Sequence, residues 1–99
     1  MKLPLLTRDE ANALIDTERD YQDRKWPDRH SGQPHLPPSD FLRLIRHIAQ
    51  QADAAWYVTQ DEIVDGIKVN PADMEAMRKI AACAKRAIEL YGCEPRIVP

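Results

Sequence analysis

The densest group of residues that could do chemistry is the charged stretch 18–26. On a helix, the polar side chains of this stretch and that of Asp16 fall on two neighbouring faces. One face carries Glu18, Tyr21, Gln22 and Lys25, and the next carries Asp16, Asp20, Asp23 and Arg24. Carboxylates one helical turn apart can hold a hard cation such as Mg²⁺ through oxygen ligands. A solvated charged face with weak salt bridges, for example Asp20 with Arg24, explains the same pattern and is the commoner arrangement.

A second acidic pair, Glu62 and Asp65, depends on the local backbone for its meaning. On a helix, the two carboxylates would face inward as a pair of metal ligands. The capping pattern of Thr59 with Glu62 is consistent with one such helical turn. Against it, β-branched residues flank the dipeptide at 65–66, and Asp-Gly favours a two-residue hairpin turn. The hairpin is slightly favoured, and in a hairpin this carboxylate pair is a polar turn.

Histidine and cysteine form no recognisable catalytic or zinc-binding pattern. The sequence has three histidines, His30, His35 and His47, without the paired ligand motifs of structural zinc sites. Cys83 and Cys93 are separated by most of three helical turns if the helix between them is continuous, which is too far for a disulfide. They are predicted to be free thiols in a reducing compartment, with Cys83 as a small core residue. Only three glycines are present, so a glycine-rich phosphate loop is not expected.

Composition indicates one small folded domain spanning residues 1–99. The chain has a formal net charge of −2, 43% hydrophobic residues and 30% charged residues. This balance predicts neither disorder nor nucleic-acid binding. We expect no signal peptide, because the first ten residues become acidic early, and no membrane contact, because no apolar run reaches about 20 residues. A cytoplasmic location is therefore expected.

The first helix is predicted over residues 7–25. Thr7 and Glu10 form a capping box, in which each side chain accepts a hydrogen bond from the other residue's backbone N–H. The apolar stripe stops near Leu14 and Ile15, so the second half of the helix is either solvated or part of a site. Trp26 precedes a proline and ends the helix. A proline-rich loop follows over 27–38, and its length favours a functional role.

Two further helices are predicted over 39–57 and 71–91, which makes the fold an all-α bundle of about three helices with a short hairpin or turn at 62–69. Ser39 is expected to cap the second helix, and Asn70 with Pro71 to begin the third, which Gly92 ends before a tail at 93–99. The apolar positions of the second helix are Phe41, Leu44, Ile45, Ile48, Ala52, Ala55 and Trp56. Those of the third helix repeat at intervals of three and four residues: Met74, Met77, Ala81, Ala84, Ile88 and Tyr91.

The apolar seam of the third helix is wider than two neighbouring helices of this length can cover, since Ile80 and Ala87 lie beside it. This width suggests a homodimer or a docking face for a partner. Met77 lies within the seam and is a candidate contact residue.

Two segments resemble a group of small helical proteins encoded by phages and prophages. Residues 15–26 look like the opening I-x-x-E-R-x-x-Q-x-x-K-W of that group, and residues 80–92 resemble its closing alanine-rich helix. Some members are distantly similar to the all-α nucleotide pyrophosphohydrolases of the MazG type, which bind Mg²⁺ through Glu-x-x-Glu and Glu-x-x-Asp. Glu62 and Asp65 match the second element. Asp20 and Asp23 give Asp-x-x-Asp where the first element would be Glu-x-x-Glu.

Two functions follow from the resemblance and the residues. The first is a non-catalytic phage accessory protein that needs no cofactor and binds a host protein in the host cytoplasm, as an inhibitor of a defence system. Its expected contact residues are Glu18, Tyr21, Gln22, Lys25, Trp26, His30 and Met77. The alternative is a dimeric, Mg²⁺-dependent nucleotide pyrophosphohydrolase. Its metal ligands would be Asp20, Asp23, Glu62 and Asp65, with Glu18 beside them.

Overall fold

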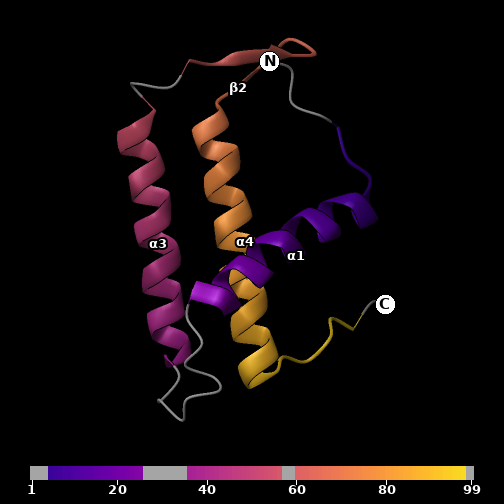
Figure 1. The fold of residues 1–99 in the computed structure, drawn as a ribbon, viewed down its shortest axis with the longest axis vertical. Helices are drawn as coiled ribbons and strands as arrows, with labels where there is room; N and C mark the ends of the chain where they lie inside the picture. The colour runs from indigo at the N-terminus through magenta and orange to yellow at the C-terminus, as the bar shows by residue number, and fades with distance from the viewer. Residues whose placement is uncertain (1–4, 26–35, 57–59, 98–99) are drawn as a thin grey trace.

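A computed structural model describes residues 5–25, 36–56 and 60–97 of the chain. In these ranges the chain forms three helices and one β-hairpin, so the predicted all-α class is confirmed (Figure 1). The elements are α1 (Arg8–Lys25), α3 (Pro38–Ala55), β1 (Glu62–Val64), β2 (Ile67–Val69) and α4 (Pro71–Tyr91). Each helix in these ranges is too short or too polar to serve as a transmembrane segment.

The start of α1 has the predicted capping box. The backbone N–H of Thr7 donates to Glu10 Oε1 over 3.0 Å, and the backbone N–H of Glu10 donates to Thr7 Oγ1 over 3.2 Å. The hydrogen bond from the Thr7 backbone N–H favours the charged carboxylate and is the main reason that the pKa of Glu10 is lowered. The helix continues to Lys25, where the prediction placed its end.

The second helix begins one residue earlier than predicted, and Ser39 is not its cap. The cap position is Pro37, whose carbonyl accepts from the backbone N–H groups of Asp40 and Phe41. Pro38 lies in the first turn, where its missing N–H has no consequence. α3 ends at Ala55, and residue 57, its predicted end, lies outside the described residues. Residues 27–35 of the predicted loop also lie outside them.

The segment 62–69 is a hairpin, which confirms the favoured alternative. Glu62 pairs with Val69 and Val64 with Ile67 in an antiparallel ladder. The turn residues Asp65 and Gly66 have φ values of 51° and 79°, as a type I′ turn requires.

Asn70 joins the hairpin to α4. Its amide nitrogen donates to Asp61 over 3.0 Å, and its side-chain oxygen accepts from the backbone N–H of Ala72 over 2.9 Å. The predicted cap at the start of α4 is therefore confirmed, and Gly92 with φ 77° ends the helix where predicted.

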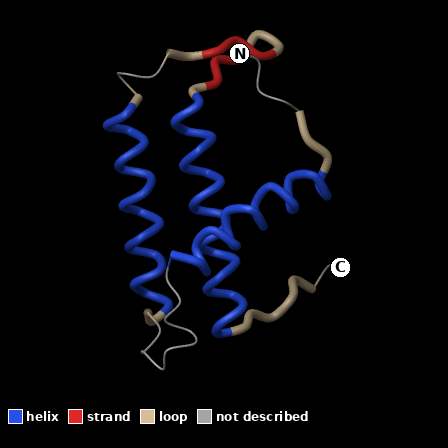
Figure 2. Tube along the Cα trace, in the orientation of Figure 1, coloured by secondary structure: helices blue, strands red, loops and turns tan. Residues whose placement is uncertain are grey.

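Helix α4 is the centre of the arrangement. α3 lies beside it and runs antiparallel to it, while α1 crosses it obliquely on one side (Figures 1 and 2). The hairpin lies at the N-terminal end of α4. Both neighbouring helices therefore contact α4.

The buried residues of α4 are not the predicted seam. They are Ala76, Ala82, Cys83 and Arg86, whereas Met74, Met77, Ile88 and Tyr91 are exposed. The buried hydrophobic residues that the structure describes are few and mostly small: Phe41, Ala76, Ala82 and Cys83. α3 buries Phe41 as expected but leaves Trp56 exposed. The buried positions of α4 are therefore small or charged.

Candidate protein-interaction site

Helix α1 contacts α4 through a polar stripe. Ile15 is half-buried, and Glu18, Arg19 and Gln22 are buried; these four residues follow the spacing i, i+3, i+4, i+7 of one helix face. All four belong to the phage-like motif, and three of them carry a charge or an amide. The motif therefore contains the side of α1 that packs against α4.

Arg19 makes the most extensive contact of the stripe. Its Nε and Nη2 donate to the two carboxylate oxygens of Glu89 on α4, over 2.8 Å and 2.7 Å. Its Nη1 donates to Asp23 Oδ1 over 3.0 Å. The hydrogen bonds to Glu89 are the main reason that the pKa of Arg19 is raised. A two-pronged contact of this kind sets the direction as well as the position of α1.

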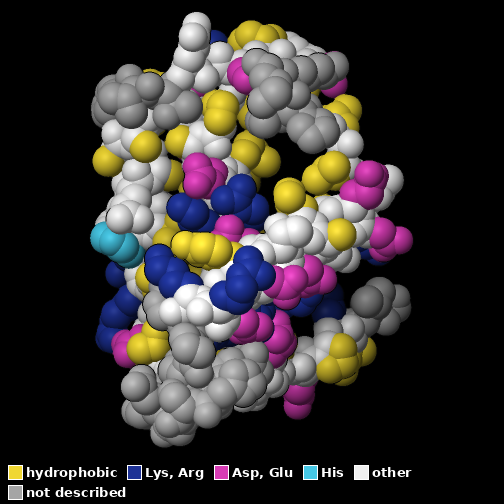
Figure 3. Space-filling model, in the orientation of Figure 1, with side chains coloured by type: hydrophobic (Ala, Val, Ile, Leu, Met, Phe, Trp, Pro, Cys, Tyr) yellow, Lys and Arg dark blue, Asp and Glu magenta, His cyan; other side chains and the backbone are white. Residues whose placement is uncertain are grey.

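Three further contacts join α1 to α4 along its length. Glu18 accepts from Arg78 Nε over 2.8 Å, and the Lys85 ammonium pairs with the Asp16 carboxylate. Gln22 Nε2 donates to Cys83 Sγ over 3.4 Å. Burial of the Cys83 thiol raises its pKa. Charged side chains gather where the two helices cross, as the space-filling view of this side shows (Figure 3).

Two of the predicted contact residues are not on the surface of the chain. Glu18 and Gln22 face α4, and the exposed fraction of Gln22 is only 3%. The second half of α1 is therefore buried along one side and solvated on the rest, where Asp20, Arg24 and Lys25 are exposed. A search for apolar residues misses this packing, because the stripe is built from charges and an amide. Its spacing from Ile15 to Gln22 was the available signal.

The predicted contact residues that remain exposed on α1 lie on one edge. We define the outer edge of α1 as Leu14, Tyr21 and Lys25, which are all exposed, Tyr21 by 48%. The Lys25 ammonium lies 5.8 Å from the centroid of the Tyr21 ring, within range of a cation–π contact. Trp26 and His30 lie outside the described residues. Met77 is exposed on α4.

The structure does not bring the predicted metal ligands together. Asp23 is bonded to Arg19 on α1, beside the C-terminal half of α4, whereas Glu62 and Asp65 lie in the hairpin before α4 (Figure 1). Asp20 is exposed. Within residues 5–25, 36–56 and 60–97, no group of three or more His, Cys, Asp or Glu side chains is arranged to hold a metal ion.

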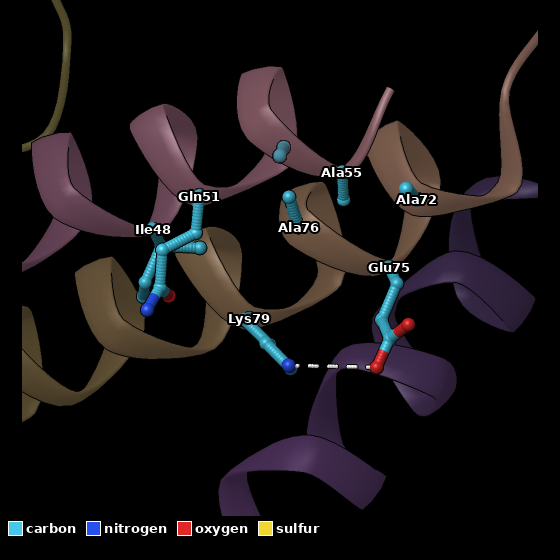
Figure 4. Close-up of a pocket in the computed structure, with 8 residues that line it drawn as sticks. Ile48, Gln51, Ala55, Ala72, Glu75, Ala76 and Lys79 are labelled. Atoms are coloured by element: carbon cyan, nitrogen blue, oxygen red, sulfur yellow. Dashed lines mark ion pairs between the residues drawn. The ribbon is translucent and has the colours of Figure 1, made fainter. Parts of the chain in front are cut away.

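A shallow groove lies between α3 and the N-terminal half of α4, and α1 passes beside it (Figure 4). Its walls are mostly small and apolar: Ile48, Ala52, Ala55, Ala72 and Ala76, together with Gln51, Glu75 and Lys79. The polar pair at its rim is joined, with Lys79 Nζ 3.4 Å from Glu75 Oε1. The groove offers apolar contact but few groups for chemistry.

No protein-family model matches the sequence, and neither a curated protein nor a solved structure matches it. Function is therefore inferred from the residues and their geometry.

Proposed function

We propose that this chain is a non-catalytic accessory protein of phage type that binds a host protein through the outer edge of α1. The observation that carries the proposal is the contrast between the two sides of this helix. Its inner side is held to α4 by Arg19 and Glu18, while its outer edge exposes Leu14 and Tyr21. The resemblance of residues 15–26 to phage-encoded proteins supports the phage origin, and inhibition of a host defence protein is the role we propose.

The outer edge has the chemistry of a protein contact. Tyrosine is enriched at binding hot spots because a large ring can be buried while its hydroxyl keeps a polar partner. Lys25 beside the ring adds a positive charge at the same edge. The ion pairs to α4 fix the helix before binding, which reduces the conformational entropy that a partner contact would cost.

Affinity capture tests the proposal. The immobilised chain is incubated with bacterial lysate, and the captured protein is then purified for direct titration. Tyr21→Ala should weaken its binding by about 10- to 100-fold, as expected for truncation of an aromatic hot spot. Gln50→Ala, at an exposed position of α3, is the matched control and should leave the affinity unchanged. Equal affinities for Tyr21→Ala and the wild type would show that this edge is not the contact.

A separate assay tests the non-catalytic part of the proposal. The purified chain is incubated with a panel of deoxynucleoside triphosphates and Mg²⁺, and pyrophosphate is measured. We expect no release above background. Release that disappears in the variant Glu62→Gln would overturn the proposal in favour of the nucleotide pyrophosphohydrolase.

A further inference from the structure

The α4 seam forms one of two apolar strips that are largely exposed among the residues that the structure describes. It comprises Met74, Met77, Ala81, Ala84, Ile88 and Tyr91, spaced three, four, three, four and three residues apart. Met77 is 57% exposed, and Ile88 is 54% exposed. The two alanines in the middle are half-buried. Apart from Tyr91, whose hydroxyl donates to the Leu36 carbonyl just before α3, this seam lies outside the contacts described above between α4 and its neighbours α1 and α3.

Helix α3 carries a second strip with the same type of spacing. It comprises Leu42, Ile45, Ala49, Ala52 and Trp56. Leu42 and Trp56 at its two ends are exposed, and Ala49 in its middle is exposed as well. The side of α3 that meets α4 is adjacent and includes Phe41 and Ile48.

Helix geometry places the two strips on the same side of the α3–α4 pair. Successive residues advance about 100° around a helix, so the α4 seam lies about 140° from the α3 side and about 100° from the α1 side. The α3 strip lies about 100° from the side that meets α4. Because the helices are antiparallel, both strips turn away from α1, which crosses the near side in Figure 1. We call the combined surface the far face.

The far face has the character of an interface between helices. No residue of the two strips carries a formal charge. Contiguous exposed apolar surface on a water-soluble chain marks a site of association. Alternating intervals of three and four residues are the spacing at which side chains of one helix fit between those of another. The expected occupant is therefore helical.

The order of large and small residues favours a second copy as that occupant. A two-fold interface pairs one surface with itself, so the surface must be complementary to its own reverse. The α4 seam reads large, large, small, small, large, large. Antiparallel pairing would set Met77 opposite Ile88 of a second copy, and Ala81 opposite Ala84. Small residues at the crossing point let two helices approach closely, and α3 is likewise small at Ala49 and Ala52.

We propose that a second copy of this chain covers the far face, with the two α4 helices antiparallel and crossing at Ala81 and Ala84. The α1 helices then lie on the outer sides of the dimer. The outer edge of α1 stays accessible in both copies, so the dimer would present two such edges. The proposed dimer does not depend on the proposed function. The two surfaces can be changed separately.

Molar mass in solution tests the proposal. The wild-type chain, of 11.4 kDa, should sediment and elute with twice that mass. Met77→Asp should raise the dissociation constant by at least about 100-fold, because each dimer would bury two uncompensated carboxylates. Gln50→Asp adds the same charge to α3 outside the far face and should remain dimeric. Circular dichroism of each variant shows whether its helices are intact.

Disulfide trapping tests the antiparallel register. Met77→Cys and Ile88→Cys are prepared separately, each with Cys93→Ser so that no exposed native thiol competes. Mixing and mild oxidation should form mainly the mixed disulfide between positions 77 and 88. Dominant pairing of each variant with itself would overturn the antiparallel arrangement.

Two other outcomes would overturn dimerisation. A wild-type chain that stays monomeric at all accessible concentrations contradicts it, and so does a dimer that is indifferent to Met77→Asp. If the monomeric chain instead binds another protein and Met77→Asp abolishes that binding, the occupant of the far face is that protein. Loss of host-protein binding in Tyr21→Ala leaves the dimer unaffected, so failure of one proposal is distinguishable from failure of the other.

Discussion

The two sides of α4 reverse the usual distribution of polar and apolar residues. The side that meets α1 is charged and partly buried, with Arg86 buried and with Arg78 and Glu89 paired to α1. The opposite side is apolar and exposed, with Met77 and Ile88 at its surface. Among the described residues, the most regular apolar pattern is thus one that α1 and α3 leave largely exposed.

This difference shows that the two contacts have different physical bases. The α1–α4 contact depends on hydrogen-bond geometry, because a bidentate guanidinium–carboxylate contact needs defined distances and angles. An apolar face tolerates rearrangement and depends on the area removed from water. Substitutions on the charged side should therefore affect folding, while those on the far face should affect association.

The largest effect on folding is expected for Arg19→Ala. The substitution removes the guanidinium group that donates to Glu89 and Asp23, and it leaves a cavity between α1 and α4. We expect the free energy of unfolding to fall by about 2–3 kcal/mol, below the range for breaking fully buried pairs because both carboxylates are partly exposed. Urea denaturation measures it. Arg19→Lys should recover less than half, and a loss below about 0.5 kcal/mol for Arg19→Ala would contradict a specific ionic contact.

A smaller effect is expected where α1 crosses α4. Ala82 is 0% exposed and lies on the same face as Arg78 and Arg86. Ala82→Leu should cost about 2 kcal/mol of unfolding free energy, because added methyl groups would force the helices apart. Ala84→Leu on the far face is the matched change. Both are measured by urea denaturation in the monomeric Met77→Asp background, where equal costs would erase the difference between the two sides.

Lys85→Ala should change folding little, although Lys85 also pairs with α1. Its partner Asp16 is exposed, and water screens the pair. We expect a loss below about 0.5 kcal/mol in urea denaturation, decreasing further at high salt. A loss comparable to that of Arg19→Ala would show that burial is not what distinguishes the two ion pairs.

The smallest expected effect is a difference in reactivity between the two thiols, which leaves folding intact. Burial raises the pKa of Cys83, so a smaller fraction of its thiol is ionised at mildly alkaline pH, while Cys93 is exposed. Because the thiolate is the reactive form, a chromogenic disulfide reagent should modify Cys93 at least about tenfold faster. Cys93→Ser should remove the fast phase. Two equally fast phases in the folded chain would show that the α1–α4 contact does not shield Cys83.

Local signals were sufficient to predict most of the fold. Thr7 with Glu10, Asn70 with Pro71, and Gly92 act on the backbone within a few residues, so their effects are legible in sequence. The Asp65-Gly66 turn is equally local. Ser39 was mispredicted as a cap because Pro37 and Pro38 already define the start of α3.

The candidate site was less predictable, because packing partners come from distant segments. Glu18 and Gln22 have the composition of a solvated face, and only contacts with Arg78 and Cys83 on α4 make them interior residues. Tyr21 and Lys25 lie at the margin of the same face, about 100° and 60° around the helix from Gln22, and both are exposed. Their exposure depends on the direction in which α1 crosses α4.

The sequence by itself determined which segments are helical, the ends of α1 and α4, and the apolar spacing of α4, since these follow from interactions within about one helical turn. The tertiary structure alone decided which face of α4 each neighbour occupies. Arg19 and Glu89 are 70 residues apart, and their pairing commits the charged side of α4 to α1. That pairing leaves most of the apolar seam from Met74 to Tyr91 on the surface of the monomer.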